Sequence, residues 1–139
     1  MGGYYNKGYM YEVALVKLLN ACGLRAIRTP HSGQVSGFDV IAVGGGRAVA
    51  FEVKHVAKPR AVTLTETELN RFREFCTNAK VPCFIAIHIS YQGWRLIPLE
   101  TVANSTIPRD VILNARELNC ETILGILKSN EDCAKPSPQ

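Results

Sequence analysis

Apolar residues recur along the chain with two periods, which predict helices and strands in alternation. Residues from about Lys7 to Ala21 carry an apolar stripe at helical spacing, and Gly23 follows as a helix stop. A second stripe follows Thr65–Glu68, whose residue types match a capping box, and it ends before Pro82. We therefore expect two amphipathic helices, the first of them packed on a sheet.

Five shorter apolar runs predict strands. They are Leu24–Arg28, Asp39–Val43, Ala48–Lys54, Cys83–Ile89 and Gly93–Leu99. The fourth run is apolar almost throughout, as in a central strand that is buried on both faces. The turn Gly44–Arg47 contains residues free to adopt positive φ and joins the second and third runs as a hairpin. The pattern as a whole predicts an α/β fold in which a central mixed sheet is flanked by helices.

The C-terminal part of the chain gives a weaker pattern. An amphipathic helix is predicted from about Arg109 to Leu127, although no residue marks its start. Residues 129–139 include Pro136 and Pro138 and are expected to form a flexible tail. Because the sequence contains neither a repeat nor an interdomain linker, residues 1–128 are expected to form a single domain.

Charged residues on the predicted hairpin carry the candidate chemistry. Asp39 opens one strand, and Glu52 and Lys54 lie on the other, in the pattern Asp-x12-Glu-x-Lys. Because side chains alternate along a strand, Glu52 and Lys54 share one face while apolar neighbours take the other, which predicts a chemical face and a core face. The reversal of the hairpin brings Asp39 toward them. The alternative is an ion pair at the surface, worth about 0–1 kcal/mol.

This set of groups is typical of metal-dependent nucleases. Hydrolysis of a phosphodiester places negative charge on the phosphate oxygens, and carboxylate-bound Mg²⁺ neutralises that charge. We expect Asp39 and Glu52 to hold Mg²⁺, with Mn²⁺ as a substitute. Lys54 could orient or deprotonate the attacking water or act as a fixed positive charge, and the sequence leaves these roles open.

Basic residues point to a polyanionic partner. The 139 residues include 16 Lys and Arg against 12 Asp and Glu, a formal charge of +4, which favours nucleic acid only if the charges cluster. The candidate phosphate contacts are Arg25, Arg28, Lys58 and Arg60, together with Ser32 and Gly33 in the polar loop before Asp39. The plain alternative is a solvated surface or, for the loop, a flexible connector.

Cysteine spacing and hydropathy argue against a zinc protein, a membrane protein and a secreted protein. The five cysteines lack the paired spacing of a zinc site. Cys22, Cys76 and Cys83 fall in apolar segments and are expected to be small buried side chains, with a disulfide left open. The sequence contains no apolar stretch of about 20 residues, and its N-terminus lacks an apolar signal core. We therefore expect a cytoplasmic protein that has no membrane partner.

Several short motifs follow one another in a fixed order between about Lys7 and Leu127. They are Lys7–Gly8 with Glu12, Leu15–Leu19, Ile27–Arg28, Ser32–Gly33, Phe38–Val40, Ala50–Lys54, Gly93–Arg95 and Leu124–Ile126. In this order the chain resembles the archaeal Holliday junction resolvases of the PD-(D/E)xK nuclease superfamily. Each motif is weak singly, and their shared order makes the match specific.

The resemblance implies a restriction-endonuclease-like fold and a single nuclease domain. It implies a structure-selective endodeoxyribonuclease that resolves four-way DNA junctions by paired symmetric nicks, in DNA recombination and repair. It also implies a homodimer, whose two-fold symmetry presents two basic surfaces to matching junction phosphates. A sliding clamp is a candidate recruiting partner.

The resemblance further implies roles for individual residues. The groups it assigns to the metal are Asp39, Glu52, the backbone carbonyl of Val53, and Glu12 as a second metal or water ligand. It places Lys54 in the catalytic core, Arg28 near the junction backbone and Ser32 in a loop that some members need for cleavage. Where several members have an arginine and a lysine, this chain has Val13 and His88, so part of the phosphate grip must come from elsewhere.

Three other functions compete with junction resolution. A less selective nuclease of the same superfamily would cut duplexes, flaps or forks. A junction-binding protein without turnover would have no reason to keep the acidic residues and Lys54. An RNA-binding module is disfavoured, because the sequence has no aromatic RNA-binding strand motif and its N-terminal tyrosines are expected to lie away from the basic loops.

Overall fold

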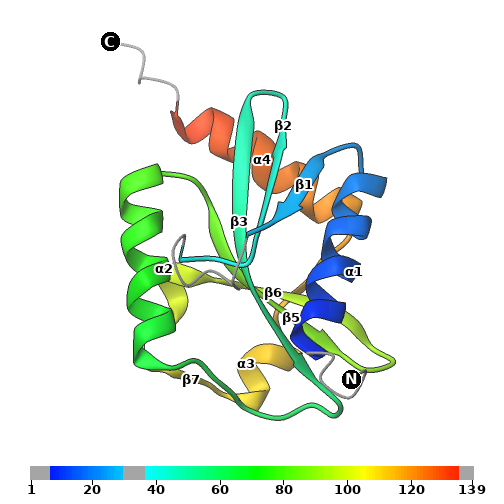
Figure 1. Ribbon diagram of the computed structural model, residues 1–139, viewed down its shortest axis with the longest axis vertical. Coiled ribbons are helices and arrows are strands. Elements are labelled where there is room, and N and C mark those ends of the chain that lie inside the picture. The colour runs from blue at the N-terminus through cyan, green and yellow to red at the C-terminus, as the bar shows by residue number, and fades with distance from the viewer. Residues whose placement is uncertain (1–6, 30–36, 135–139) are drawn as a thin grey trace.

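A mixed six-stranded sheet lies at the centre of the computed structural model, which describes residues 7–29 and 37–134. The strand order is β1-β2-β3-β5-β6-β8, and only β3 and β5 in this sheet run parallel (Figure 1). The helices are α1 (Lys7–Ala21), α2 (Glu66–Ala79), α3 (Arg109–Leu113) and α4 (Cys120–Ala134), and the 3-10 turn η3 is Leu99–Thr101. The strands are β1 (Arg25–Arg28), β2 (Val40–Gly44), β3 (Arg47–Val56), β4 (Val62–Thr63), β5 (Cys83–Ile89), β6 (Gly93–Pro98), β7 (Thr106–Ile107) and β8 (Arg116–Glu117). The predicted α/β class and mixed sheet are confirmed.

The β2–β3 hairpin has the predicted turn and leaves one edge of β3 open. Gly45 and Gly46 adopt φ of +59° and +79°, as the tight reversal requires. In the register, Gly44 lies opposite Arg47 and Val40 lies opposite Phe51. Because β2 begins at Val40, residues 52–56 of β3 run past it and pair only with β5 among the described strands. We call this side of residues 52–56, with which none of the described strands pairs, the open edge of β3.

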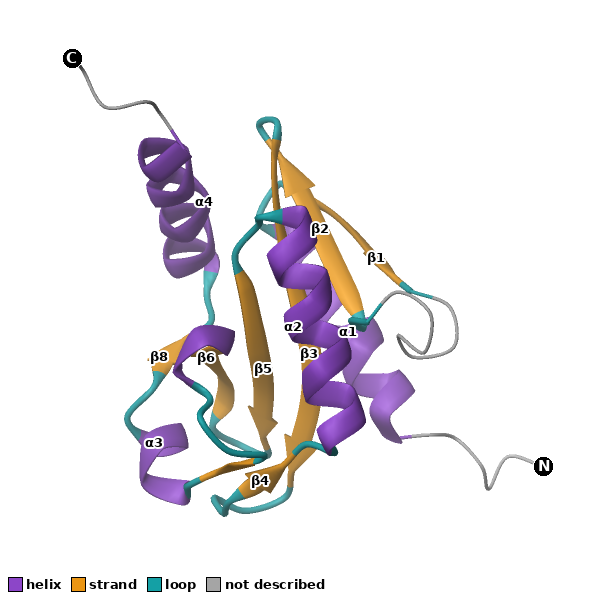
Figure 2. Ribbon diagram, turned by 90° about the vertical axis from the view of Figure 1, so that its left-hand side faces the viewer, coloured by secondary structure: helices purple, strands orange, loops and turns teal. Residues whose placement is uncertain are grey.

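Helices cover both faces of the sheet, so the core has two parts. In Figure 2, α2 lies in front of β3 and beside β5, and α1 lies behind the sheet. The α1 and α4 face buries Leu15, Leu19, Val49, Phe51, Val53, Ile123 and Leu127. The α2 and α3 face buries Ala50, Val56, Leu69, Phe72, Ile87 and Ile112. The prediction that the face of β3 carrying Glu52 is a chemical face only is therefore wrong, because Ala50 and Val56 on the same face are packed under α2.

The predicted C-terminal helix is wrong in its extent. Its span contains the five-residue helix α3, the short strand β8 and then α4. Leu118 is buried in the turn between β8 and α4, where its apolar side chain mimicked a helical stripe. At the other end, α4 continues to Ala134, so residues 129–134, expected in the tail, are helical, and residues 135–139 lie outside the described part.

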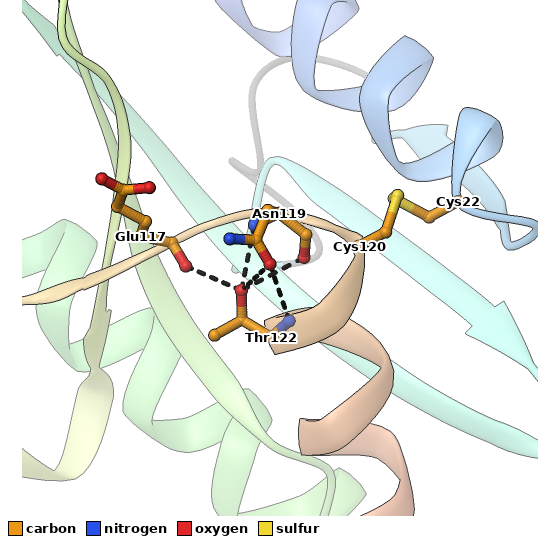
Figure 3. The surroundings of a disulfide bond; sticks show 5 residues. All are labelled: Cys22, Glu117, Asn119, Cys120 and Thr122. Atoms are coloured by element: carbon orange, nitrogen blue, oxygen red, sulfur yellow. Dashed lines mark hydrogen bonds between the residues drawn. A yellow bond between two sulfur atoms is a disulfide. The ribbon is translucent and has the colours of Figure 1, made fainter.

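A disulfide joins the residue after α1 to the first residue of α4 (Figure 3). Cys22 and Cys120 are bonded across a sequence separation of 98 residues, with 5.2 Å between their Cα atoms. The expectation that Cys22 is a simple buried thiol is therefore wrong, whereas Cys83 is buried as predicted and Cys76 is half-buried. Beside the disulfide, Asn119 and Thr122 cap the start of α4: each side-chain oxygen accepts from the other residue's N–H, at 2.9 and 3.0 Å.

Candidate active site

Two buried carboxylates, Asp39 and Glu52, meet at the open edge of β3. Asp39 directly precedes β2, and its backbone N–H donates to the Phe51 carbonyl at 2.9 Å. This pairing folds its side chain back onto β3, where Oδ2 accepts from the Val53 N–H at 2.8 Å. Asp39 is 3% exposed and Glu52 7% exposed. The hairpin therefore brings the predicted acidic pair together, as strand alternation required.

The two carboxyl groups are held where their charges are unfavourable. Burial raises the pKa of Glu52 most, and the negative charge of Asp39 raises it further. Burial likewise raises the pKa of Asp39, although its bond from Val53 N–H opposes the shift. Pairs of carboxylates that resist ionising together are typical of sites completed by a cation.

The donor set fits a hard divalent ion such as Mg²⁺. In a strand, the N–H and C=O of one residue point to the same edge. The Val53 N–H donates to Asp39 at the open edge, so the Val53 carbonyl points to that edge as well. Within residues 7–29 and 37–134, no cluster of three or more His, Cys, Asp or Glu side chains could hold a metal. A site here would therefore combine the two carboxylates, a backbone carbonyl and water, a combination that suits Mg²⁺.

Glu12 approaches this pair from α1 but is already paired with a cation. Its side chain is buried, and Oε1 accepts from Arg28 Nε and lies 2.9 Å from a terminal guanidinium nitrogen. Burial raises the pKa of Glu12, opposed by the hydrogen bond and charge of Arg28, and the charge of Glu12 in turn raises the pKa of Asp39. Arg28 also lies 4.3 Å from the ring centroid of Tyr9, so this tyrosine is close to a basic site residue after all.

Lys54 lies beside the acidic pair and donates hydrogen bonds to the carboxylate of Glu68, which the sequence analysis did not include among the candidate site residues. Its Nζ is 3.8 Å from Glu52 Oε2 and 3.0 and 3.2 Å from the two carboxylate oxygens of Glu68. Glu68 belongs to the capping box of α2, which predicted its backbone contact correctly. The packing of α2 on β3 supplies the contact with Lys54.

An aromatic stack lies on the opposite face of β3 from Lys54. Tyr11 of α1 stacks on His55 at 3.9 Å and on His88 at 4.7 Å between ring centroids, and Trp94 contacts the His88 ring edge-on. The two histidines face each other with 3.0 Å between their Nδ1 atoms. His88 of β5 and His55 of β3 thus belong to one stack, which packs on the side of the sheet that α1 covers.

The candidate phosphate contacts are spread over the surface. Arg28 lies at the end of β1 near the carboxylates, and Lys58 and Arg60 are exposed in the segment that follows β3. Arg25 is exposed opposite Val43, near the hairpin turn, so the structure does not bring it to the carboxylates. Ser32 and Gly33 lie outside the described residues.

Comparison with known proteins agrees with this architecture. The family model described as archaeal Holliday junction resolvase (hjc) matches residues 3–131. Among solved structures, Hjc of Archaeoglobus fulgidus, a Holliday junction resolvase from an archaeal hyperthermophile, is similar with a TM-score of 0.73 at 22% identity. The alignment covers 86% of this chain and 97% of that chain. At this identity the structural likeness shows the fold, which is restriction-endonuclease-like.

Proposed function

The chain belongs to the archaeal Holliday junction resolvase family and is a junction-resolving endonuclease, and from this premise we propose that Asp39, Glu52 and Lys54 carry out Mg²⁺-dependent cleavage. The observation that supports these roles is the open edge of β3, where two buried carboxylates with raised pKa lie beside an ammonium group. Paired symmetric nicks in two opposed strands are the proposed outcome.

Some residues of the open edge are proposed to hold the metal, and others to orient water. Asp39, Glu52 and the Val53 carbonyl would hold Mg²⁺, which when bound supplies neutralising charge for the phosphate and activates a water. Lys54, with 3.8 Å between its ammonium and Glu52, would orient that water or stabilise negative charge on the phosphate. Glu12, which is held by Arg28, would accept a hydrogen bond from a second water.

DNA is proposed to be gripped through its phosphates. Arg28 at the edge of the site and the exposed Lys58 and Arg60 beyond β3 supply positive charge at the same end of β3 as the carboxylates. Such contacts read the angles between junction arms and need no base-edge contact. Ser32 and Gly33 stay predictions, as does recruitment by a sliding clamp, and residues 1–128 are proposed to form the nuclease domain.

A homodimer is proposed because symmetric nicking needs two active sites. The sheet face beside α2 supports this proposal, because two apolar side chains on it are exposed. Ile27 of β1 is 64% exposed, and Val43 of the neighbouring strand β2 is 45% exposed. An uncovered apolar sheet face is typical of a subunit interface. Replacing both residues with glutamate should give a monomer in sedimentation, and a variant that stays dimeric would assign the interface elsewhere.

The proposal is tested by cleavage of a fixed four-way junction in Mg²⁺ beside its component linear duplexes. We expect paired nicks in the junction alone from the native chain. The matched variant Asp39→Asn should bind the junction and leave it uncut. Equal cutting of the linear duplexes would instead establish a less selective nuclease, and tight binding by the native chain without cutting would refute the enzyme.

A further inference from the structure

The ammonium group of Lys54 lies between two carboxylates of different surroundings. Toward β3 it is 3.8 Å from the buried Glu52, whose side chain is 9% exposed. Toward α2 it is within 3.0 and 3.2 Å of both oxygens of Glu68, whose side chain is 35% exposed. The closer, two-oxygen contact is the one made by the residue outside the proposed metal ligands.

Glu68 is itself fixed at the first turn of α2. Its Oε1 also accepts from the Thr65 N–H at 2.8 Å, and its own N–H donates to the Thr65 hydroxyl at 3.0 Å. The same carboxylate thus completes the helix cap and binds Lys54, and its hydrogen bonds hold the pKa of Glu68 below the ordinary value although burial opposes them. Glu68 is therefore a fixed, ionised anchor.

The contact with Glu68 restricts the positions that the Lys54 ammonium can take. Lysine has a flexible four-carbon stem and a compact charge that many rotamers can place. The nearest other carboxyl is that of Glu52, at 3.8 Å and beside Asp39, and an ammonium drawn fully onto this pair would compete with a metal ion for their oxygens. The Glu68 contact holds the ammonium to one side of these carboxyls, toward α2.

We propose that Glu68 is a positioning residue for junction cleavage, which acts by holding the Lys54 ammonium at the rim of the metal site. This inference rests on the proposed function, because it assumes that Lys54 assists the reaction at the open edge of β3. Glu68 touches neither metal nor DNA in this account. Its removal should therefore lower the rate of the cleavage step and leave junction affinity unchanged.

The experiment compares Glu68→Gln with Glu66→Gln, which removes the same charge from the same helical turn but at an exposed residue. Single-turnover cleavage of an immobile junction is measured with enzyme in excess and saturating Mg²⁺, alongside the junction Kd. We expect the rate of Glu68→Gln to fall about 10–100-fold, the range that a misplaced catalytic group gives. The junction Kd should stay within about twofold of the native value, and Glu66→Gln should match the native chain in both measurements.

A third variant separates positioning from helix stability. Thr65→Ala removes the hydroxyl that caps α2 but keeps the backbone N–H that bonds Glu68, so it weakens the helix start without releasing Lys54. It should lower the melting temperature and keep the cleavage rate at 25 °C.

Three results would overturn the assignment. They are a Glu68→Gln rate equal to that of Glu66→Gln, a Glu68→Gln rate above the native one, and a Thr65→Ala rate that falls in parallel with Glu68→Gln. Each of these requires a native chain that cuts the junction. A native chain that leaves the junction uncut would refute the proposed function itself, so the two failures are distinguishable.

Discussion

The open edge of β3 and the corner where α1 meets α4 are built in opposite ways. At the open edge, Asp39 and Glu52 are buried together with raised pKa values, and the nearest ammonium is shared with Glu68. At the corner, a disulfide and a reciprocal cap join Cys22 to Cys120 and Asn119 to Thr122. The first arrangement costs stability in the absence of metal, and the second supplies it.

The difference shows that the candidate active site depends on support from the rest of the fold. Charges that repel one another persist only where the surrounding structure holds them in place, and they are typical of catalytic sites. Two layers of helices on the sheet, tied at one corner by a covalent bond, supply that support. Changes at the open edge and changes at the corner should therefore affect activity and stability in opposite patterns.

The largest effect is expected from Glu52→Gln. Removing one metal ligand should lower junction cleavage by at least about 10³-fold, because the site stabilises charge in the transition state mainly through the ion. The same change should raise the melting temperature in EDTA at pH 8 by about 3–8 °C, because glutamine is neutral at every pH, whereas burial raises the pKa of Glu52 to about 9 and so makes folding at pH 8 take up a proton.

The sign of the stability change follows from the raised pKa of Glu52. The folded chain holds this proton more tightly than the unfolded chain, so the native protein loses stability as pH rises above the ordinary value of 4.5. The difference in melting temperature between native and Glu52→Gln chains should therefore widen from pH 5 to pH 8. A difference that narrows would contradict the geometry of the carboxyl pair.

The next effect is on stability alone. Replacing Cys22 and Cys120 together by serine should lower the free energy of unfolding by about 2–5 kcal/mol, because the disulfide closes a long loop. Junction cleavage at 25 °C should stay within twofold of the native rate. Urea unfolding of the double variant and of the native chain, with and without reductant, measures the stability, and a large loss of cleavage by the folded variant would show that the two regions are coupled.

A moderate effect is expected from pH on metal affinity. Mg²⁺ needs both carboxyls ionised, and burial raises the pKa of Asp39 and of Glu52, so lowering the pH from 8 to 6 should weaken Mg²⁺ binding by about tenfold or more. Titration calorimetry in two buffers of different ionisation enthalpy should show protons released on binding. An affinity independent of pH would remove the carboxyl pair from the metal site.

The smallest effect concerns phosphate contacts outside both regions. Lys58→Gln or Arg60→Gln should reduce the slope of log affinity against log salt concentration by about 0.9 for each phosphate that the variant no longer neutralises. Lys128→Gln, at an exposed residue of α4, is the matched control and should keep the native slope. Equal slopes for all variants would exclude the segment after β3 from the DNA interface.

What the sequence could predict was local. The acidic hairpin follows from strand alternation and a glycine turn, both of which act within about fifteen residues of Asp39. The capping box of α2 was predicted for the same reason, because its two bonds join residues three positions apart. The family was inferred from the order of the motifs, because hydrophobic periodicity alone does not identify a family.

What the sequence could not predict depends on contacts between distant segments. The bond from Lys54 to Glu68 exists only because α2 packs on β3, and the disulfide only because α1 and α4 share one face of the sheet. The C-terminal helix was misplaced because Leu118 continued an apolar stripe, although Asn119 followed three residues later by Thr122 is a cap signal that marks the true start of α4.

The most direct test of the central claim is to locate the metal itself. A crystal of the native chain soaked in Mn²⁺ should give an anomalous scattering peak at the open edge of β3, within about 2.5 Å of Asp39, Glu52 and the Val53 carbonyl. The same soak of Glu52→Gln crystals should give no peak there. A native crystal whose Mn²⁺ binds elsewhere, with this edge empty at saturating concentration, would contradict the account.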